Sequence, residues 1–118
     1  MKLHKNMHIL IEPKENGLIR FAQVYNKVSR GEYVKPWKGI GFPNLAEFRR
    51  TFTDKRVELL KAIKKHEPKS IYGLAKILKR DYKNVYDDVN YLANFGLIER
   101  TGNNLFVGYD KITMECGL

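Results

Sequence analysis

Three segments with helical spacing of apolar residues follow one another, with short breaks, in the second half of the chain. Each begins after a residue that favours the helix N-cap, namely Thr53, Ser70 and Asp81. Pro68 bars continuation of the first helix, and Gly96 is a favoured residue just past the end of the third. Three helices joined by such short turns must pack together to bury their apolar faces. This arrangement constrains the fold more than any other feature.

A hairpin signal follows the third helical segment. The β-rich runs "LIERT" and "LFVGY" are joined by Gly102, Asn103 and Asn104, which are residue types typical of tight turns. The later run "DKITME" predicts one more strand. Three helices followed by a β-hairpin are the order of a winged helix-turn-helix. We therefore expect an α+β fold with a three-helix core, a β-hairpin wing and an N-terminal extension.

The first part of the chain has a different character. Residues 8–13 predict a strand and residues 16–30 predict an amphipathic helix. A loop rich in proline and glycine follows, with an extended piece near residues 40–42. We divide the chain into an N-terminal extension, 1–43, and a winged helix-turn-helix domain, 44–118.

The third helical segment has an unusual outward face. Val85, Val89 and Leu92 form a narrow apolar stripe, and tyrosines, amides and one lysine crowd the remaining surface. Such a helix lies in the major groove in a helix-turn-helix, where Tyr reaches phosphates, Asn pairs with adenine and Lys contacts guanine or phosphate. The candidate DNA-binding residues are Ser70, Tyr72, Lys76, Arg80, Tyr82, Lys83, Asn84, Tyr86, Asp87, Asn90, Arg100, Asn103 and Asn104.

These candidates have structural alternatives. Asn84 either reads a base or extends the cap begun by Asp81, and Lys83 beside it is expected to contact phosphate. For Lys76 and Arg100, phosphate contact and an ordinary solvated face are equally good interpretations.

Other polar residues of the same helix are expected to serve the protein itself. Tyr91 is the tyrosine we place against the rest of the protein. Asp88 is expected to pair inward with Arg56 or Arg80, and Asp87 to lie beside the lysine one turn earlier.

The same residues resemble a known family. The stretch from Thr53 to Arg100, above all "RDYKNV" and the following Asp-Val and Gly-Leu-Ile, is similar to the HVO_A0114-type DNA-binding proteins of archaea and bacteria, which are related to MarR-like regulators. The resemblance extends over residues 44 to 115 and includes the closing "GYDKITME". It implies a winged-helix transcription regulator without naming a target, and some family members are encoded beside toxin genes.

The charge and the cysteine content of the chain indicate the kind of partner and the cellular compartment to expect. The chain has 22 Lys and Arg against 13 Asp and Glu, a net charge of +9 and a pI near 9.7. This balance favours a polyanionic partner, nucleic acid before membrane.

Cys116 is the single cysteine, so no internal disulfide forms, which fits a reducing compartment. The apolar run at the N-terminus is too short for a signal peptide or a membrane span. We expect a cytoplasmic protein that does not enter a membrane.

The sequence offers no catalytic, metal or cofactor pattern. His4 and His8 are four residues apart, but a strand does not bring that spacing together, and His66 stands alone. The "GIGF" stretch lacks the lysine and helix of a phosphate-binding loop. We therefore expect neither enzyme activity nor a cofactor.

Four functions remain open from these patterns. The first is a sequence-specific regulator of double-stranded DNA that forms a homodimer, with the helix around Phe21 and Tyr25 as the dimer contact. The second is an antitoxin-like protein that binds a toxin through its N-terminal segment and autoregulates its operon. The third is a winged-helix protein-interaction module without DNA binding, and the fourth is an RNA binder.

Overall fold

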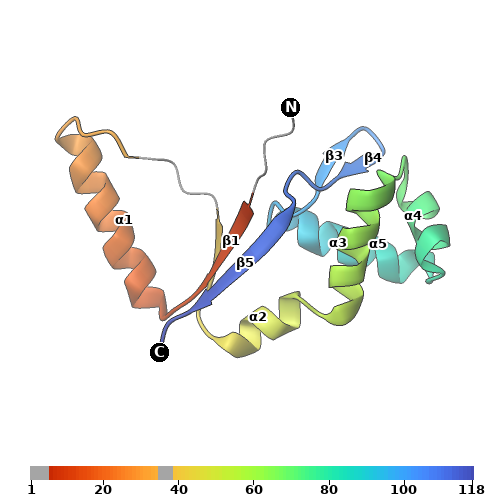
Figure 1. Ribbon diagram of the computed structural model, residues 1–118, viewed down its shortest axis with the longest axis horizontal. Helices are drawn as coiled ribbons and strands as arrows, with labels where there is room; N and C mark the ends of the chain where they lie inside the picture. The colour runs from red at the N-terminus through yellow and green to blue at the C-terminus, as the bar shows by residue number, and fades with distance from the viewer. Residues whose placement is uncertain (1–5, 35–38) are drawn as a thin grey trace. The chain divides into compact units, whose positions relative to one another are not determined.

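The computed structural model describes residues 6–34 and 39–118 of the chain (Figure 1). They form two compact units: unit 1 contains residues 50–110, and unit 2 contains residues 6–49 together with 111–118. The fold is mixed α+β, as predicted. The elements in chain order are β1 (Asn6–Ile11), α1 (Lys14–Ser29), β2 (Gly39–Phe42), α2 (Leu45–Thr51), α3 (Asp54–His66), α4 (Ile71–Leu78), α5 (Tyr82–Asn94), β3 (Glu99–Thr101), β4 (Asn104–Phe106) and β5 (Lys111–Cys116).

The three helices of unit 1 begin where the sequence predicts them. Thr53, Ser70 and Asp81 are the N-caps of α3, α4 and α5, and each side-chain oxygen accepts a hydrogen bond from the backbone N–H three residues later. These bonds satisfy donors that the first helical turn leaves without intrahelical partners. Gly96 follows α5 with φ +77°, the conformation expected of a glycine just past a helix end.

The core of unit 1 combines all three helices with the β3–β4 hairpin. In α3, Val57 is only half-buried, whereas Leu59 is fully buried. Leu105 brings the hairpin into this core, and its backbone N–H donates to the Pro68 carbonyl at 3.0 Å. The buried apolar side chains are Leu59, Leu60, Ile63, Ile71, Leu74, Ala75, Val85, Val89, Leu92, Leu97, Ile98, Leu105, Val107 and Tyr109.

The segment after the hairpin is fastened to the helices of unit 1. The Tyr109 hydroxyl donates to the Leu97 carbonyl at 3.0 Å, and burial raises the pKa of the Tyr109 phenol. Lys64 of α3 forms an ion pair with Asp110 at 2.8 Å and donates to the Val107 carbonyl at 3.3 Å. The C-terminal end of unit 1 is therefore held against its helices.

Unit 2 is built on a parallel three-stranded sheet in the order β2-β1-β5. Its central strand aligns Ile9 with Ile40 on one side and with Met114 on the other. The sequence predicts the strand β5 but not its position, because its partner β1 is separated from it by more than 90 residues of chain. The structure thus differs from the division at residue 43: the last residues of the chain pair with the first strand.

Helix α1 connects β1 to β2 without contributing to a core. None of its residues, all of which the structure describes, is buried. Arg20 of α1 forms an ion pair of 2.6 Å with Glu12, the residue that follows β1. In the described part of unit 2, the buried apolar residues are Ile9, Ile11 and Phe42 of the sheet.

The short helix α2 follows β2. The Asn44 side chain accepts a hydrogen bond from the Glu47 N–H at 2.9 Å, so Asn44 caps this helix. Across the described ranges, none of the helices has the length and apolar character needed to cross a bilayer.

Candidate nucleic-acid interface

Helix α5 presents one apolar side to the core and a broad polar side to the surroundings. Val85, Val89 and Leu92 are buried, which confirms the predicted stripe. The side chains of Tyr82, Lys83, Asn84, Tyr86 and Asp87 are exposed on its N-terminal half. The six candidates on α5 therefore do belong to one surface, with Asn90 half-buried at its edge.

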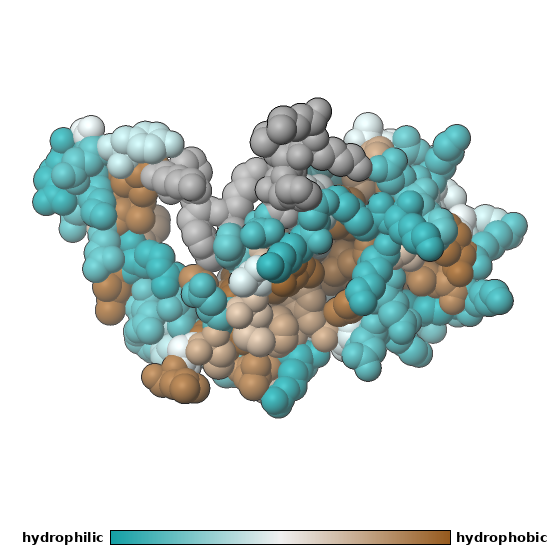
Figure 2. All heavy atoms as spheres, in the orientation of Figure 1, coloured by the Kyte–Doolittle hydropathy of each residue, from teal (hydrophilic) through white to brown (hydrophobic). Residues whose placement is uncertain are grey.

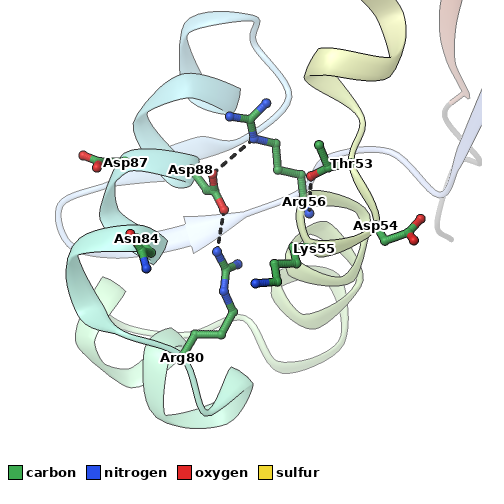
Figure 3. Close-up of a pocket in the computed structure, with 8 residues that line it drawn as sticks. All are labelled: Thr53, Asp54, Lys55, Arg56, Arg80, Asn84, Asp87 and Asp88. Carbon is green, nitrogen blue, oxygen red and sulfur yellow. Dashed lines mark hydrogen bonds and ion pairs between the residues drawn. The ribbon is translucent and has the colours of Figure 1, made fainter.

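An ion-pair cluster fixes α5 against the other two helices (Figure 3). Asp88 accepts from Arg56 Nε at 3.1 Å and from Arg80 Nη2 at 2.8 Å, so one carboxylate links α5 to α3 and to the α4–α5 turn. Arg56 also donates to the carbonyls of Arg50 and Thr51. The expectation that Asp88 pairs inward is confirmed, and it pairs with both predicted partners.

The same cluster changes the interpretation of Arg80. Its side chain is 18% exposed and is engaged by Asp88, while its second terminal nitrogen, Nη1, is buried with no hydrogen-bond partner among the described residues. A guanidinium held this way is a support for α5 rather than a free phosphate contact.

Beside this cluster the surface is hollowed. The hollow has a volume of about 600 Å³. Asn84 faces it from the first turn of α5, as Figure 3 shows. Its charged residues, three cationic and three anionic, balance, so the hollow alone does not select an anion. The lining residues are Thr53, Asp54, Lys55, Arg56, Arg80, Asn84, Asp87 and Asp88.

A row of tyrosines lies along the α4–α5 surface. The rings of Tyr82 and Tyr86 stack with centroids 6.0 Å apart, and Tyr72 of α4 approaches Tyr82 at 6.4 Å. The Lys76 ammonium lies 4.6 Å from the centre of the Tyr72 ring. All three rings are more than 40% exposed, so their hydroxyls and edges remain available to a partner.

Tyr91 differs from these three tyrosines. Its hydroxyl lies 3.1 Å from the Thr51 hydroxyl, and the Arg56 guanidinium covers its ring at 4.1 Å. Phe95 packs against the same ring at 5.2 Å. The prediction that Tyr91 packs against the rest of the protein is confirmed.

The β3–β4 hairpin reaches α5 through Arg100. Its guanidinium donates to the Asn90 side-chain oxygen at 3.0 Å. Asn103 and Asn104 are exposed at the hairpin turn. The hairpin candidates therefore lie on the same unit as α5, and Arg100 is held beside that helix.

The remaining candidate, Ser70, is half-buried, and its hydroxyl accepts from the Gly73 N–H at 2.9 Å. Sequence reasoning missed Lys55, which lines the same hollow as Asn84. No local pattern signals this, since Lys55 belongs to α3 and Asn84 to α5, and only the tertiary structure brings the two helices to one hollow.

Among the described residues, the histidines and the cysteine do not form a cluster. Within the described ranges, no three His, Cys, Asp or Glu side chains are grouped so that they could hold a metal ion. His8 is exposed on β1 and His66 is exposed at the end of α3, whereas His4 lies outside the described residues.

The chain was compared with known proteins. The HVO_A0114 family model matches residues 51–114, which is more than half of the chain and includes α3 to β4 and most of β5. The protein therefore belongs to the HVO_A0114 family. No curated protein and no solved structure matches the chain.

Proposed function

We propose that this HVO_A0114 family member is a transcription regulator that binds double-stranded DNA sequence-specifically through α5. In this proposal, unit 1 is a winged helix-turn-helix of the MarR-like kind, in which α3, α4 and α5 form the helical core and the β3–β4 hairpin is the wing. The observation that carries the proposal is the polar N-terminal half of α5, whose side chains are exposed while the opposite side of the helix is locked into the core.

The rigidity of α5 supports this function. Recognition needs a helix whose orientation is set before DNA arrives, because ordering it on binding would cost affinity. Three buried side chains and the Arg56–Asp88–Arg80 cluster supply that orientation. The first turns of α5 are thereby presented outward, and these are the turns that contact base edges in helix-turn-helix proteins.

The charge of unit 1 is compatible with a phosphate backbone. Residues 50–110 contain 12 Lys and Arg against 8 Asp and Glu, a net charge of +4. Lys76 on α4 precedes α5 in the chain and Arg100 on the hairpin follows it. Both side chains are exposed and suited to phosphate contacts. Asp87 opposes phosphate binding in its vicinity, although a carboxylate in the groove can accept from cytosine.

Different residues of α5 have different proposed roles. Lys83 is an exposed, flexible cation and contacts phosphate in this proposal. Asn84 is exposed beside the hollow and pairs with adenine, with Tyr86 as the next candidate for a base contact. Asn90 is less suitable for reading bases, since its side-chain oxygen already accepts from Arg100.

The test is duplex binding by the full chain. Sequences retained from a random duplex pool would define a site, and affinity for that site would be measured by fluorescence anisotropy across salt concentrations. Lys83→Ala should weaken binding to all duplexes similarly and lower the salt slope by about one. Lys61→Ala, which removes the same charge from an exposed position on α3, is the matched control and should change the slope less.

Asn84→Ala should act on sequence preference instead. Losing a bidentate amide–adenine contact should flatten discrimination at one base pair by about 1–3 kcal/mol and leave non-specific binding nearly intact. The variant should stay folded by circular dichroism, because the cap of α5 uses the Asn84 backbone N–H and not its side chain. Absence of duplex binding at low salt by the folded wild-type protein would overturn the proposal.

A further inference from the structure

Helix α1 has a large apolar surface that the described residues leave exposed. Leu18 is 66% exposed, Phe21 70%, Tyr25 64% and Val28 59%. Figure 2 shows apolar side chains along this helix. Contiguous apolar patches of such side chains on soluble proteins mark interaction sites.

Helix α1 also lacks the packing interactions that usually stabilise a helix of its length. Isolated helices of about this length are marginal in water, and most helices in proteins are stabilised by packing one apolar face. Here no residue of α1 is buried, and Gly17 further lowers its helix propensity. A partner that covers the apolar face would supply the missing packing.

The order of the apolar residues resembles a helix-pairing pattern. Leu18, Phe21, Tyr25 and Val28 are spaced by three, four and three residues, which is the alternation of the a and d positions in a heptad. Continued toward the N-terminus, the same spacing reaches Lys14 in the first turn, whereas α1 ends at Ser29 and Glu32 follows in the chain after the left-handed Gly31. The apolar row therefore has a cation at its N-terminal end, and an anion follows the helix at the other end.

These residues match a reversed copy of themselves. When two α1 helices lie antiparallel with Phe21 of each opposite Tyr25 of the other, Leu18 lies opposite Val28, and Lys14 of each copy lies at the helix end that Glu32 of the other copy follows. A parallel pair would instead set Lys14 against Lys14 and Glu32 against Glu32. Antiparallel pairing also brings opposite ends of the helix dipoles together.

The charged ends are free to take part. Lys14 is exposed, and Glu32 makes an exposed contact of 3.4 Å with Arg30, which is too weak and too solvated to hold it there. A two-fold symmetric interface uses the same patch on both copies, which this self-complementary order provides.

We propose that α1 is the self-association surface of this protein and that two copies pair their α1 helices antiparallel. The groove beside α1, about 820 Å³ and lined by Leu10 and Phe42 of the sheet as well as by Phe21, Val24 and Val28, lies next to this interface and gives the partner additional apolar contacts. The inference does not depend on what unit 1 binds. Since one pair of short helices is a small interface, the dimer is expected to dissociate in the micromolar range.

The first measurement is sedimentation equilibrium of the full chain from about 1 to 100 µM, a range set to bracket a micromolar constant. The wild-type protein should be a dimer at the upper end. Phe21→Glu should raise the dissociation constant at least about a hundredfold, because it places a charge in the centre of the interface. Gln23→Glu, which adds the same charge to the polar side of α1, is the matched control and should change it by less than about threefold.

The second measurement tests the antiparallel register. Lys14→Glu alone and Glu32→Lys alone should each weaken self-association by roughly tenfold, because each creates two like-charge pairs in the symmetric dimer. Mixing the two variants should restore the wild-type affinity, since both pairs in the mixed dimer again carry opposite charges. This recovery also shows that both variants are folded.

Three results would overturn the inference. One is a wild-type monomer at 100 µM, which would mean that another protein or nothing covers α1. Another is a dimer that Phe21→Glu leaves intact. The third is a mixture of the two charge variants that associates no better than either variant alone.

Discussion

The two units of this protein bury their apolar side chains to very different degrees. Unit 1 buries apolar side chains from each of its helices and from its hairpin, and contacts of Tyr109 and Lys64 fix its C-terminal end. Unit 2 buries apolar residues in its sheet and leaves its longest helix bare. Parallel sheets are ordinarily covered on both faces. The difference indicates that unit 1 contains the packing for its own stability, whereas unit 2 leaves the apolar side chains of α1 exposed.

The largest effect on the free energy of unfolding should come from creating a cavity in the core of unit 1. Leu74 is fully buried in α4, so Leu74→Ala should lower the free energy of unfolding by about 2–5 kcal/mol through lost transfer energy and a residual cavity. The equivalent change in α1, Leu18→Ala, should alter it by no more than about 0.5 kcal/mol in dilute solution. Urea unfolding followed by circular dichroism measures both. Equal losses in the two variants would contradict the contrast between the units.

The next effect should come from removing the shared carboxylate of α5. Asp88→Ala leaves Arg56 and Arg80 without their common partner while both remain largely buried. A loss of about 2–3 kcal/mol is expected, somewhat below the range for fully buried pairs because each group keeps some solvent contact. Asp87→Ala, which removes an exposed carboxylate one position earlier, is the control and should cost within about 0.5 kcal/mol. A tolerated Asp88→Ala would show that packing alone orients α5.

A smaller effect is expected where the chain leaves unit 1. Tyr109→Phe removes the hydrogen bond to the Leu97 carbonyl and should cost about 1 kcal/mol at neutral pH. Burial raises the pKa of Tyr109, so the folded state keeps the proton that an unfolded tyrosine loses near pH 10. The stability due to this proton is complete below about pH 10 and is lost as the pH rises above it, with a slope of at most about 1.4 kcal/mol per pH unit. Unfolding free energies measured from pH 8 to 11 should therefore fall more steeply for the wild type than for Tyr109→Phe, and parallel curves would refute this role.

The smallest effect should distinguish two glycines, one in each unit. A Cβ added at Gly17 meets no atom within 4 Å, so Gly17→Ala should strengthen α1 by about 0.5–1 kcal/mol and raise the helical signal. Gly96 has φ +77°, so Gly96→Ala at the end of α5 should instead cost about 1 kcal/mol. Circular dichroism at 222 nm and thermal unfolding compare the two. A loss of helicity in Gly17→Ala would mean that α1 is not limited by its own helix propensity.

Local structure in unit 1 was predictable because its causes are local. A capping hydroxyl or carboxylate acts on an N–H three residues away, and Gly102 and Asn103 close a hairpin between directly adjacent strands. The stripe of Val85, Val89 and Leu92 follows from helical periodicity alone. These rules predicted the helices, their starts and the buried side of α5.

The candidate interface was only partly predictable for the same reason. Which residues of α5 are exposed follows from the stripe, but Arg80 was placed among the DNA contacts and is engaged by Asp88 in the structure. We expected Asp88 to point inward. That it pairs with two arginines at once depends on the tertiary structure, because the two arginines belong to separate elements. The tertiary structure also brings Lys55 to the hollow that Asn84 lines.

The sequence by itself therefore determined the secondary structure, the caps and the amphipathic character of α1 and α5, since each depends on residues within a turn or two. Only the tertiary structure decided that β5 returns to pair with β1, because parallel pairing joins distant segments through backbone hydrogen bonds that carry little side-chain signature. It also decided that, in the part of the chain that the structure describes, no residue of α1 is buried. An amphipathic pattern predicts that one face of a helix will be buried. Whether residues of the same chain bury that face depends on the positions of all the other elements in the fold.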